Sequence, residues 1–275
     1  MTTDDERGKT ARVTREFRTR IEAGVWRDGE ALPGTRTLAE QFGVSIATVN
    51  EAMKALATEG LVENRARSGR VVRSAHLVNI PVRRRPHVVL VGGYAGTGKT
   101  EFGRIMTRLT GWMHIDKDTI TRPVVEAALE ALGRPASDRE SPTYLSQIRP
   151  REYEALIATA HDNVSCGAGA ILTAPFLREY ADPAWLAREL NRFANEGANS
   201  TVVWVTCDIE SMHTYLRGRG AARDNHKLEA WDEYLTSIDL DFRPPVNHVV
   251  IDNSASAEPL KTQAERLVSQ IAEPA

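Results

Sequence analysis

The sequence predicts a doubly wound parallel α/β domain preceded by a small α+β domain. The 275-residue length exceeds the usual size of one domain. Strand and helix periods alternate only in the last two thirds of the chain, and prolines that extend the backbone bracket the segment PVRRRP at 81–86. We therefore expect domains at 1–75 and 87–275, joined by a basic linker at 76–86. The linker arginines either contact a polyanion or are solvated.

Charge divides at the same place. Residues 1–86 hold 16 Lys and Arg against 11 Asp and Glu, a net charge of +5, and the rest hold 19 against 26, a net charge of −7. This asymmetry favours a basic domain that binds a polyanion beside an acidic domain with another task. The chain has no run of 18 apolar residues, and its N-terminus is too charged for a signal peptide, so we expect no membrane contact and a cytoplasmic location. Cys166 and Cys207 lie in apolar stretches, which favours buried, reduced thiols.

Three amphipathic helices are expected in the basic domain. Apolar residues recur every three or four positions over 10–23, 36–42 and 46–60. Thr35 and Ser45 are of the types that cap helix N-termini, and they precede the second and third helices. A tight glycine-containing turn separates these two helices, which is the helix-turn-helix pattern.

Two short strands are expected next, at 61–63 and 70–72, around the basic turn NRARSG. A strand pair beside a helix-turn-helix makes a winged helix. A winged helix predicts DNA binding. The alternative is a protein-interaction module that has lost this activity, but the basic arginines of the wing argue against it.

The stretch LPGTRTLAEQFGVSIATVNEAMKALATEGLVENRARSGRVV resembles the GntR family of bacterial transcription regulators, over about residues 10–73. The resemblance implies a homodimer on a double-stranded DNA operator, with the third helix at the major groove and the wing near the minor groove. The residues that it implies at the DNA lie in the second helix, the start of the third helix and the wing: Thr35, Arg36, Ser45, Ile46, Ala47, Thr48, Asn50, Arg67 and Gly69.

Two of these positions depart from the family, which commonly has arginine where this chain has Ile46 and Asn50. An apolar side chain contacts the thymine methyl group, and asparagine pairs with adenine. We therefore expect an operator that favours A·T base pairs.

The acidic domain opens with a valine-rich strand at 87–92, followed by GYAGTGKT at 93–100, which fits G-x-x-x-x-G-K-[ST]. In this P-loop motif, backbone N–H groups surround phosphate oxygens, Lys99 reaches the β- and γ-phosphates, and the Thr100 hydroxyl holds Mg²⁺. We therefore predict that the domain binds ATP, or another purine nucleoside triphosphate, with Mg²⁺. The expected binding residues are Gly93, Tyr94, Ala95, Gly96, Thr97, Gly98, Lys99, Thr100 and Glu101.

Strands and helices alternate downstream, which predicts a parallel sheet with its ligand at the carboxyl ends of the strands. The expected strands are 112–115, 168–173, 200–206 and 247–251. The expected helices are 99–109, 119–132, 143–165, 183–196, 208–217 and 257–271.

Asp116 and Asp118 follow the second strand, where an aspartate can accept a proton from a substrate hydroxyl or hold Mg²⁺ through water. Asp118 can instead cap the helix that begins at Thr119. The third strand ends in Thr173, where a Walker-B acid would stand, which argues against a motor ATPase.

The segment RGRGAARD at 217–224 predicts a mobile lid over the phosphates, or else a solvated basic turn. With the P-loop and D-x-D, it resembles the small P-loop kinases, such as gluconate kinase, chloramphenicol phosphotransferase, and the zeta-toxin and polynucleotide-kinase types, over about 87–253. The resemblance implies Lys99 and Asp116 as catalytic residues, Asp116 being the base, and Arg219 and Arg223 on the phosphates. It also implies the nucleotide base near Asn253.

A small-molecule phosphoryl acceptor would lie between 119–150 and 176–182, where candidate side chains are available: Arg122, Arg149, Arg151, Arg178 and Tyr180. The sequence then supports two functions. One is a transcription regulator whose kinase-like domain senses nucleotide and modulates operator binding. The alternative is a bifunctional regulator with an active ATP-dependent small-molecule kinase domain.

Overall fold

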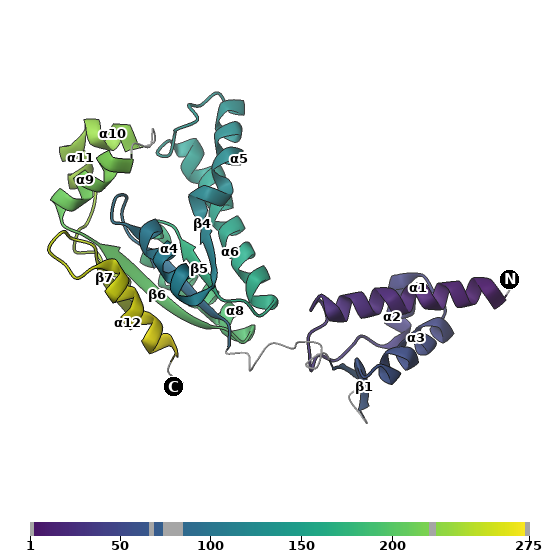
Figure 1. Ribbon diagram of the computed structural model, residues 1–275. Coiled ribbons are helices and arrows are strands. Elements are labelled where there is room, and N and C mark those ends of the chain that lie inside the picture. The colour runs from purple at the N-terminus through teal and green to yellow at the C-terminus, as the bar shows by residue number, and fades with distance from the viewer. Residues whose placement is uncertain (1–2, 66–68, 74–84, 220–223, 273–275) are drawn as a thin grey trace. The chain divides into compact units, whose positions relative to one another are not determined.

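Two compact units make up the chain, residues 1–83 and 84–275. The computed structural model describes residues 3–65, 69–73, 85–219 and 224–272 (Figure 1).

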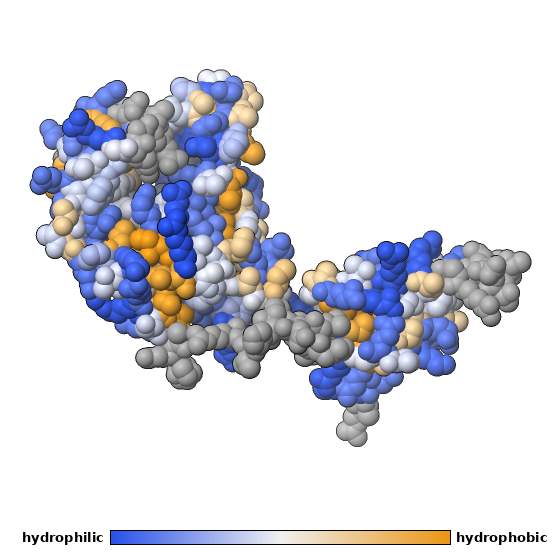
Figure 2. Space-filling view, in the orientation of Figure 1, coloured by the Kyte–Doolittle hydropathy of each residue, from blue (hydrophilic) through white to orange (hydrophobic). Residues whose placement is uncertain are grey.

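The first unit contains three helices and a two-stranded antiparallel sheet, as predicted. Its elements are α1 (Thr3–Glu22), α2 (Thr35–Phe42), α3 (Ile46–Thr58), β1 (Val62–Arg65) and β2 (Gly69–Val72). Each helix contributes a fully buried apolar side chain to one core: Phe17, Leu38 and Leu56. Figure 2 shows that the visible face of this unit is mostly hydrophilic, as expected for helices that bury a single apolar stripe.

The two predicted helix caps have different outcomes. Ser45 caps α3 as expected, because its Oγ accepts a hydrogen bond from the Thr48 amide at 3.1 Å. Thr35 does not cap α2, because the helix already includes it and Gly34 takes the cap position without a side-chain bond. The Thr35 hydroxyl instead accepts a hydrogen bond from the Arg70 guanidinium of β2 at 3.0 Å.

The second unit is built on a five-stranded parallel sheet with the strand order β4-β5-β3-β6-β7. Side chains of the central strand β3 alternate between the two faces: Val88 and Leu90 pack into one core, and Val89 and Val91 into another. Burial on both faces explains the continuous apolar run of this strand. The strands are β3 (His87–Gly92), β4 (Met113–Asp116), β5 (Ala170–Thr173), β6 (Asn199–Thr206) and β7 (His248–Asp252).

Helices cover both faces, so the domain is doubly wound as predicted (Figure 1). On one face lie α4 (Lys99–Thr110) and α12 (Leu260–Ala272), and on the other α6 (Arg149–Ser165), α7 (Leu177–Ala181) and α8 (Pro183–Asn195). Two further groups stand on either side of the carboxyl ends of the strands: α5 (Lys117–Ala131) with the π-helical turn η2 (Tyr144–Ile148), and α9 (Ile209–Arg219), α10 (Asn225–Glu229) and α11 (Trp231–Thr236).

Some local expectations were wrong. The helix expected over 143–165 begins with the π-helical turn η2, and the short helices α7, α10 and α11 were not expected because they hold too few residues to show a period. Cys207 is buried as expected, but Cys166 is exposed at the end of α6. Among the described residues, no helix is long and apolar enough to cross a membrane.

Candidate functional site

A cleft of about 960 Å³ opens at the carboxyl ends of the strands in the α/β unit. Mostly hydrophilic surface, formed by α5 and by α9 to α11, flanks this region in Figure 2. We call the part lined by 94–96, 98–101 and Asn253 the P-loop end. The other part, which we call the arginine end, is lined by Asp118, Arg139, Tyr144, Arg149 and Arg178.

The P-loop end begins with a backbone that only glycine fits. Gly93 and Gly98 have φ of 148° and 92°, and a Cβ atom would collide with the Val205 carbonyl at the first and with the Asn253 amide at the second. Gly98 caps α4, whose first N–H groups have no partner within the helix. This arrangement can hold an anion.

Three side chains donate hydrogen bonds to backbone carbonyls of the P-loop. The Lys99 ammonium donates to the Tyr94 carbonyl at 2.5 Å, and the buried Thr97 hydroxyl donates to the same oxygen at 3.0 Å. The Asn253 amide, at the end of β7, donates to the Thr97 carbonyl at 3.1 Å. The structure thus brings the predicted Asn253 to the P-loop, 156 residues away in sequence from Thr97.

Three oxygen-bearing side chains meet next to Lys99. Asp116 Oδ2 accepts hydrogen bonds from the Thr100 hydroxyl at 2.9 Å and from the Thr173 hydroxyl at 2.8 Å. Asp116 and Thr173 are paired residues at the ends of β4 and β5. The carboxylate that β5 itself lacks is therefore supplied by the neighbouring strand.

Asp116 also caps α5, which corrects the expectation that Asp118 does so. Asp116 Oδ1 accepts from the Thr119 amide at 3.0 Å and from its hydroxyl at 3.2 Å, while Asp118 lies inside the first turn of the helix. The cap fixes the Asp116 side chain, whereas Asp118 lies 2.9 Å from the Lys117 ammonium and lines the cleft.

The remaining residues that were predicted to bind nucleotide differ in whether they line the cleft. Ala95, Gly96 and Glu101 line the cleft, whereas Gly93 and Thr97 are not part of its lining. The Tyr94 ring packs edge-on against Trp204, with a centroid distance of 5.6 Å, and its hydroxyl accepts from the Asp239 amide at 3.0 Å.

The expected lid falls largely outside the described residues. Arg219 is the last residue of α9, but its side chain is not described, and Arg223 is outside the described residues. The roles of both arginines therefore stay predictions.

The predicted acceptor residues separate into two groups. Arg149 and Arg178 line the cleft, whereas Arg122 and Arg151 do not, and Tyr180 is fully buried with its hydroxyl bonded to the Leu90 carbonyl at 2.7 Å. Sequence reasoning missed four residues here: Lys117, Arg139, Tyr144 and Glu152. Only the last carried a sequence signal, because Glu152 occupies the apolar stripe of α6 beside Leu156.

In the first unit, the predicted DNA residues surround the start of α3. Arg36, Ser45, Ala47 and Asn50 are exposed, and Ile46 is 49% exposed although it is apolar. Thr48, which was expected to lie at the major groove, is buried, and its hydroxyl bonds to Ser45 Oγ at 2.9 Å.

The wing contributes from β2. Gly69 has φ of 73° and is exposed, while Arg67 lies outside the described residues. Arg70 donates to Asn50 Oδ1 at 2.9 Å, so it holds the amide that was expected to read adenine.

Comparison with known proteins matches both units. The family model of bacterial regulatory proteins, gntR family, matches residues 9–72, and the family model of an AAA domain matches residues 88–240. A proposed kinase from Chloroflexus aurantiacus J-10-fl, with 13% identity and a TM-score of 0.50, shares the fold over 68% of this chain and 98% of its own.

Curated relatives match shorter segments. YjiR, an uncharacterized HTH-type transcriptional regulator of Escherichia coli (strain K12), is 48% identical over 50 residues, which are 18% of this chain and 11% of that protein. A shikimate kinase of Moorella thermoacetica (strain ATCC 39073 / JCM 9320) is 34% identical over 107 residues, which are 36% of this chain and 57% of the kinase. The chain thus spans less than two thirds of either relative. The AAA domain model matches more than half of the residues of this chain, and a gntR-family domain precedes this kinase-like domain. The protein therefore belongs to the AAA domain family.

Proposed function

We propose that the protein is a DNA-binding transcription regulator whose kinase-like domain binds ATP with Mg²⁺ and thereby modulates operator binding. The observation that carries the nucleotide half is the meeting of Thr100, Asp116 and Thr173 beside the P-loop. The gntR-family match and the exposed start of α3 support the DNA half.

The residues at the P-loop end fit Mg²⁺ and ATP. Mg²⁺ prefers oxygen ligands and is commonly held by one or two protein oxygens together with phosphates and water. The Thr100 hydroxyl and the Asp116 carboxylate would hold it, and the bound ion would neutralise charge on the phosphate oxygens. Among the described residues, no three His, Cys, Asp or Glu side chains form a metal cluster, which suits a metal shared with phosphates.

Regulation requires that nucleotide bind the DNA-bound and DNA-free states with unequal affinity. The net charges of the two units provide a mechanism for unequal affinity. The α/β unit has a negative net charge, as DNA does, while the unit with the winged helix has a positive net charge. We propose that nucleotide changes the placement of the acidic unit, and with it the repulsion from DNA. Deleting residues 87–275 should then change operator affinity.

The test uses DNA selected from random fragments by the full-length protein. We expect ATP to change the affinity for the selected operator at fixed salt by about fivefold or more. Lys99→Ala should abolish this change, and Lys261→Ala, at an exposed position on α12, should preserve it. Equal affinity with and without ATP would argue against nucleotide sensing.

The same selection tests the base preference. The exposed Ile46 and Asn50 predict A·T base pairs in each half-site. Half-sites rich in G would contradict this expectation. Two half-sites would also support a homodimer, which sedimentation of the free protein checks independently.

A second candidate function, active phosphoryl transfer to a small molecule, is favoured by the arginine end of the cleft. The P-loop alone would suffice for a sensor, whereas the cleft continues past it to Asp118. We propose Asp118 as the group that accepts the acceptor's proton, because Asp116 is committed to Thr100, Thr119 and Thr173. A phosphorylated product made by the wild-type protein, and not by Lys99→Ala, would establish the kinase.

A further inference from the structure

His114, two residues before Asp116 on β4, begins a chain of hydrogen bonds that ends at the P-loop helix. His114 Nε2 lies 3.1 Å from Thr173 Oγ1. The Thr173 hydroxyl in turn bonds to Asp116 Oδ2, the oxygen that also accepts from Thr100 of α4. His114 does not belong to the described lining of the cleft, whereas the other three residues do. A hydrogen-bonded effect of His114 on a ligand therefore passes through Thr173.

The parallel register of β4 and β5 brings these groups together. Asp116 is the register partner of Thr173, and His114 is that of Ile171. Because side chains two residues apart on a strand lie on the same face, His114 and Asp116 both lie beside Thr173. Thr173 is 2% exposed, so protein groups rather than bulk water decide the direction of its hydroxyl.

The proton positions along this chain follow from the number of protons that each group holds. A threonine hydroxyl has one proton, and the Thr173 hydroxyl donates it to Asp116 Oδ2 at 2.8 Å. Toward His114 the same oxygen can therefore only accept, so His114 Nε2 carries a proton and donates it. A His114 ring without a proton on Nε2 would instead accept the Thr173 proton, and Asp116 would lose one of its donors.

Helix α4 leaves room for this histidine at Gly103. A Cβ atom on Gly103 would lie 2.7 Å from His114 Nε2 and 2.6 Å from Thr173 Cγ2, closer than Cβ contacts allow. Glycine is otherwise unfavourable in the interior of a helix. The His114 ring thus packs closely against the helix that begins at Lys99, and its position is tied to that of the P-loop end.

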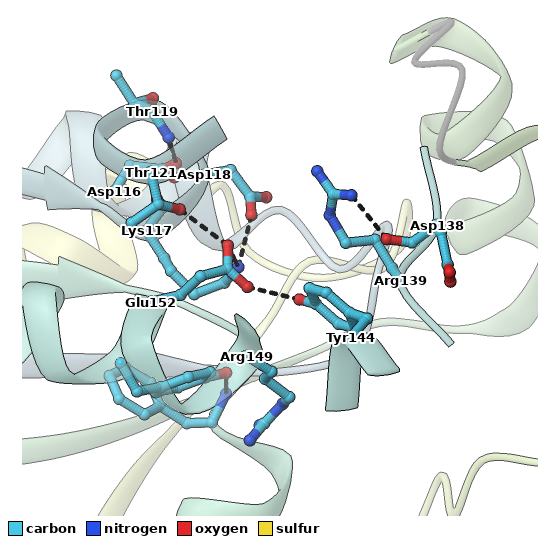
Figure 3. Close-up of polar contacts among 12 residues, drawn as sticks. Asp116, Lys117, Asp118, Thr119, Thr121, Asp138, Arg139, Tyr144, Arg149 and Glu152 are labelled. Carbon is cyan, nitrogen blue, oxygen red and sulfur yellow. Dashed lines mark hydrogen bonds and ion pairs between the residues drawn. The ribbon is translucent and has the colours of Figure 1, made fainter. Parts of the chain in front are cut away.

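Asp116 is held at both of its carboxylate oxygens. Oδ1 accepts from the amide and the hydroxyl of Thr119 at the start of α5 (Figure 3). Oδ2 accepts from Thr100 and Thr173. The carboxylate is therefore oriented by α5 at one oxygen and by the chain from His114 at the other. Mg²⁺ demands near-octahedral geometry, so its affinity depends on how such a carboxylate is held.

We infer that His114 is a positioning residue of the Mg²⁺ site. Its Nε2 proton turns the Thr173 hydroxyl toward Asp116, and the Thr173 proton holds Asp116 Oδ2 beside Thr100. This inference rests on the proposed function, in which Thr100 and Asp116 hold Mg²⁺ with ATP. Groups that orient a metal ligand in this way typically contribute about 10- to 100-fold to metal affinity.

The test measures the ADP affinity of the full-length protein by calorimetry, once with millimolar Mg²⁺ and once with EDTA. The ratio of the two dissociation constants is the Mg²⁺ effect. His114→Phe keeps an aromatic ring but removes the donor, and it should reduce the Mg²⁺ effect about tenfold with the affinity in EDTA unchanged. His114→Gln carries an amide donor at a similar reach, and it should retain the Mg²⁺ effect within about threefold.

His87 provides a matched control at the other end of the sheet. It begins β3, and its Nε2 bonds to the Thr201 hydroxyl of β6 at 2.8 Å, the same pair of groups as His114 and Thr173. His87→Phe removes that bond at the amino ends of the strands, whereas the cleft lies at their carboxyl ends. It should leave the Mg²⁺ effect unchanged, so a loss that comes only from a weakened sheet would appear in both variants.

Thr173→Val tests the route from His114 to Asp116. It removes the hydroxyl between them but keeps a side chain of similar shape, and it should also reduce the Mg²⁺ effect about tenfold. Because both changes break the same chain, the double variant should lose no more than Thr173→Val alone. If His114→Phe does not fold, His114→Asn takes its place, since its shorter amide does not reach Thr173 and should give the same loss.

The outcomes separate this inference from the proposed function. A wild-type protein that binds no ADP, or binds it no more tightly with Mg²⁺, would overturn the proposed function. A normal Mg²⁺ effect in the wild type overturns the inference alone if His114→Phe retains that effect, or if His114→Gln loses as much as His114→Phe. The inference also fails if the losses of His114→Phe and Thr173→Val multiply in the double variant.

Discussion

The two ends of the cleft are built in different ways. The P-loop end is made of consecutive residues whose backbone holds the geometry, with Gly93 and Gly98 at positions that only glycine fits. The arginine end is made of side chains that lie far apart in sequence, such as Lys117 and Glu152, 35 residues apart. A backbone site depends on a few conformations, whereas a side-chain site depends on every partner in its network.

The largest effect that this comparison predicts is on stability at the arginine end. Glu152→Ala should lower the free energy of unfolding of the α/β unit by about 3 kcal/mol, because it leaves a buried ammonium with half of its compensation. Urea unfolding monitored by tryptophan fluorescence measures this, since four of the five tryptophans lie in that unit.

Glu154→Ala is the matched control two residues away. Its carboxylate pairs with Arg151 at the surface, where both side chains are more than half exposed, so the loss should be about 0.5 kcal/mol or less. Equal losses for the two variants would mean that the buried network does not stabilise the fold.

A second prediction compares substitutions at the two ends of helix α4. Gly98 and Gly111 cap its N- and C-termini, and both have positive φ, 92° and 73°. Gly98→Ala adds a Cβ that meets the Asn253 amide, and it should weaken nucleotide affinity about 100-fold by distorting the loop around the phosphates.

Gly111→Ala meets nothing within 4 Å. It should cost about 1 kcal/mol of stability through backbone strain alone, with unchanged nucleotide affinity. Calorimetric titration with ADP and Mg²⁺ compares the two. Similar affinities would show that the P-loop end tolerates a change of backbone conformation, contrary to the comparison.

A third prediction concerns Asp116, which accepts a hydrogen bond from Thr100 of the P-loop end and caps helix α5, the helix that carries Asp118 of the arginine end. Asp116→Asn keeps the size of the group, but it removes the charge beside Thr100. We expect about a tenfold loss of ADP affinity at millimolar Mg²⁺, and no loss without Mg²⁺, because the charge acts through the metal. Asp162→Asn, exposed on α6, is the control. The same loss with and without Mg²⁺ would place Asp116 outside the metal site.

The difference between the ends also explains what could be predicted from the sequence. The sequence predicts the P-loop residue by residue, because a fixed spacing after an apolar strand encodes it, and its binding of nucleotide stays a prediction. The position of Asp116 beside Thr100 could be expected because carboxyl ends of parallel strands meet at one edge. Its role as the cap of α5 was missed, since Asp116 and Asp118 lie two residues apart and either could precede a helix start.

No local period encodes the arginine end. Arg139 lies in a loop and donates hydrogen bonds to carbonyls of the same loop. Glu179, the carboxylate that pairs with Arg149, comes 30 residues later in the chain, on a helix of only five residues. Long helices and buried strands could be predicted, because each of these elements contains its own apolar period. Contacts between distant polar side chains require the folded chain.

The smallest predicted effect concerns the exposed carboxylate of the arginine end. Asp118→Asn removes one of the two carboxylates beside the Lys117 ammonium, while Glu152 still holds it. Because the Asp118 side chain is 34% exposed, solvent screens its pair with Lys117, and the free energy of unfolding should fall by about 1 kcal/mol or less. Urea unfolding measures this loss beside that of Glu152→Ala. A loss as large as that of Glu152→Ala would mean that Lys117 depends equally on both carboxylates, and that the exposed side of the network stabilises the fold as much as the buried side.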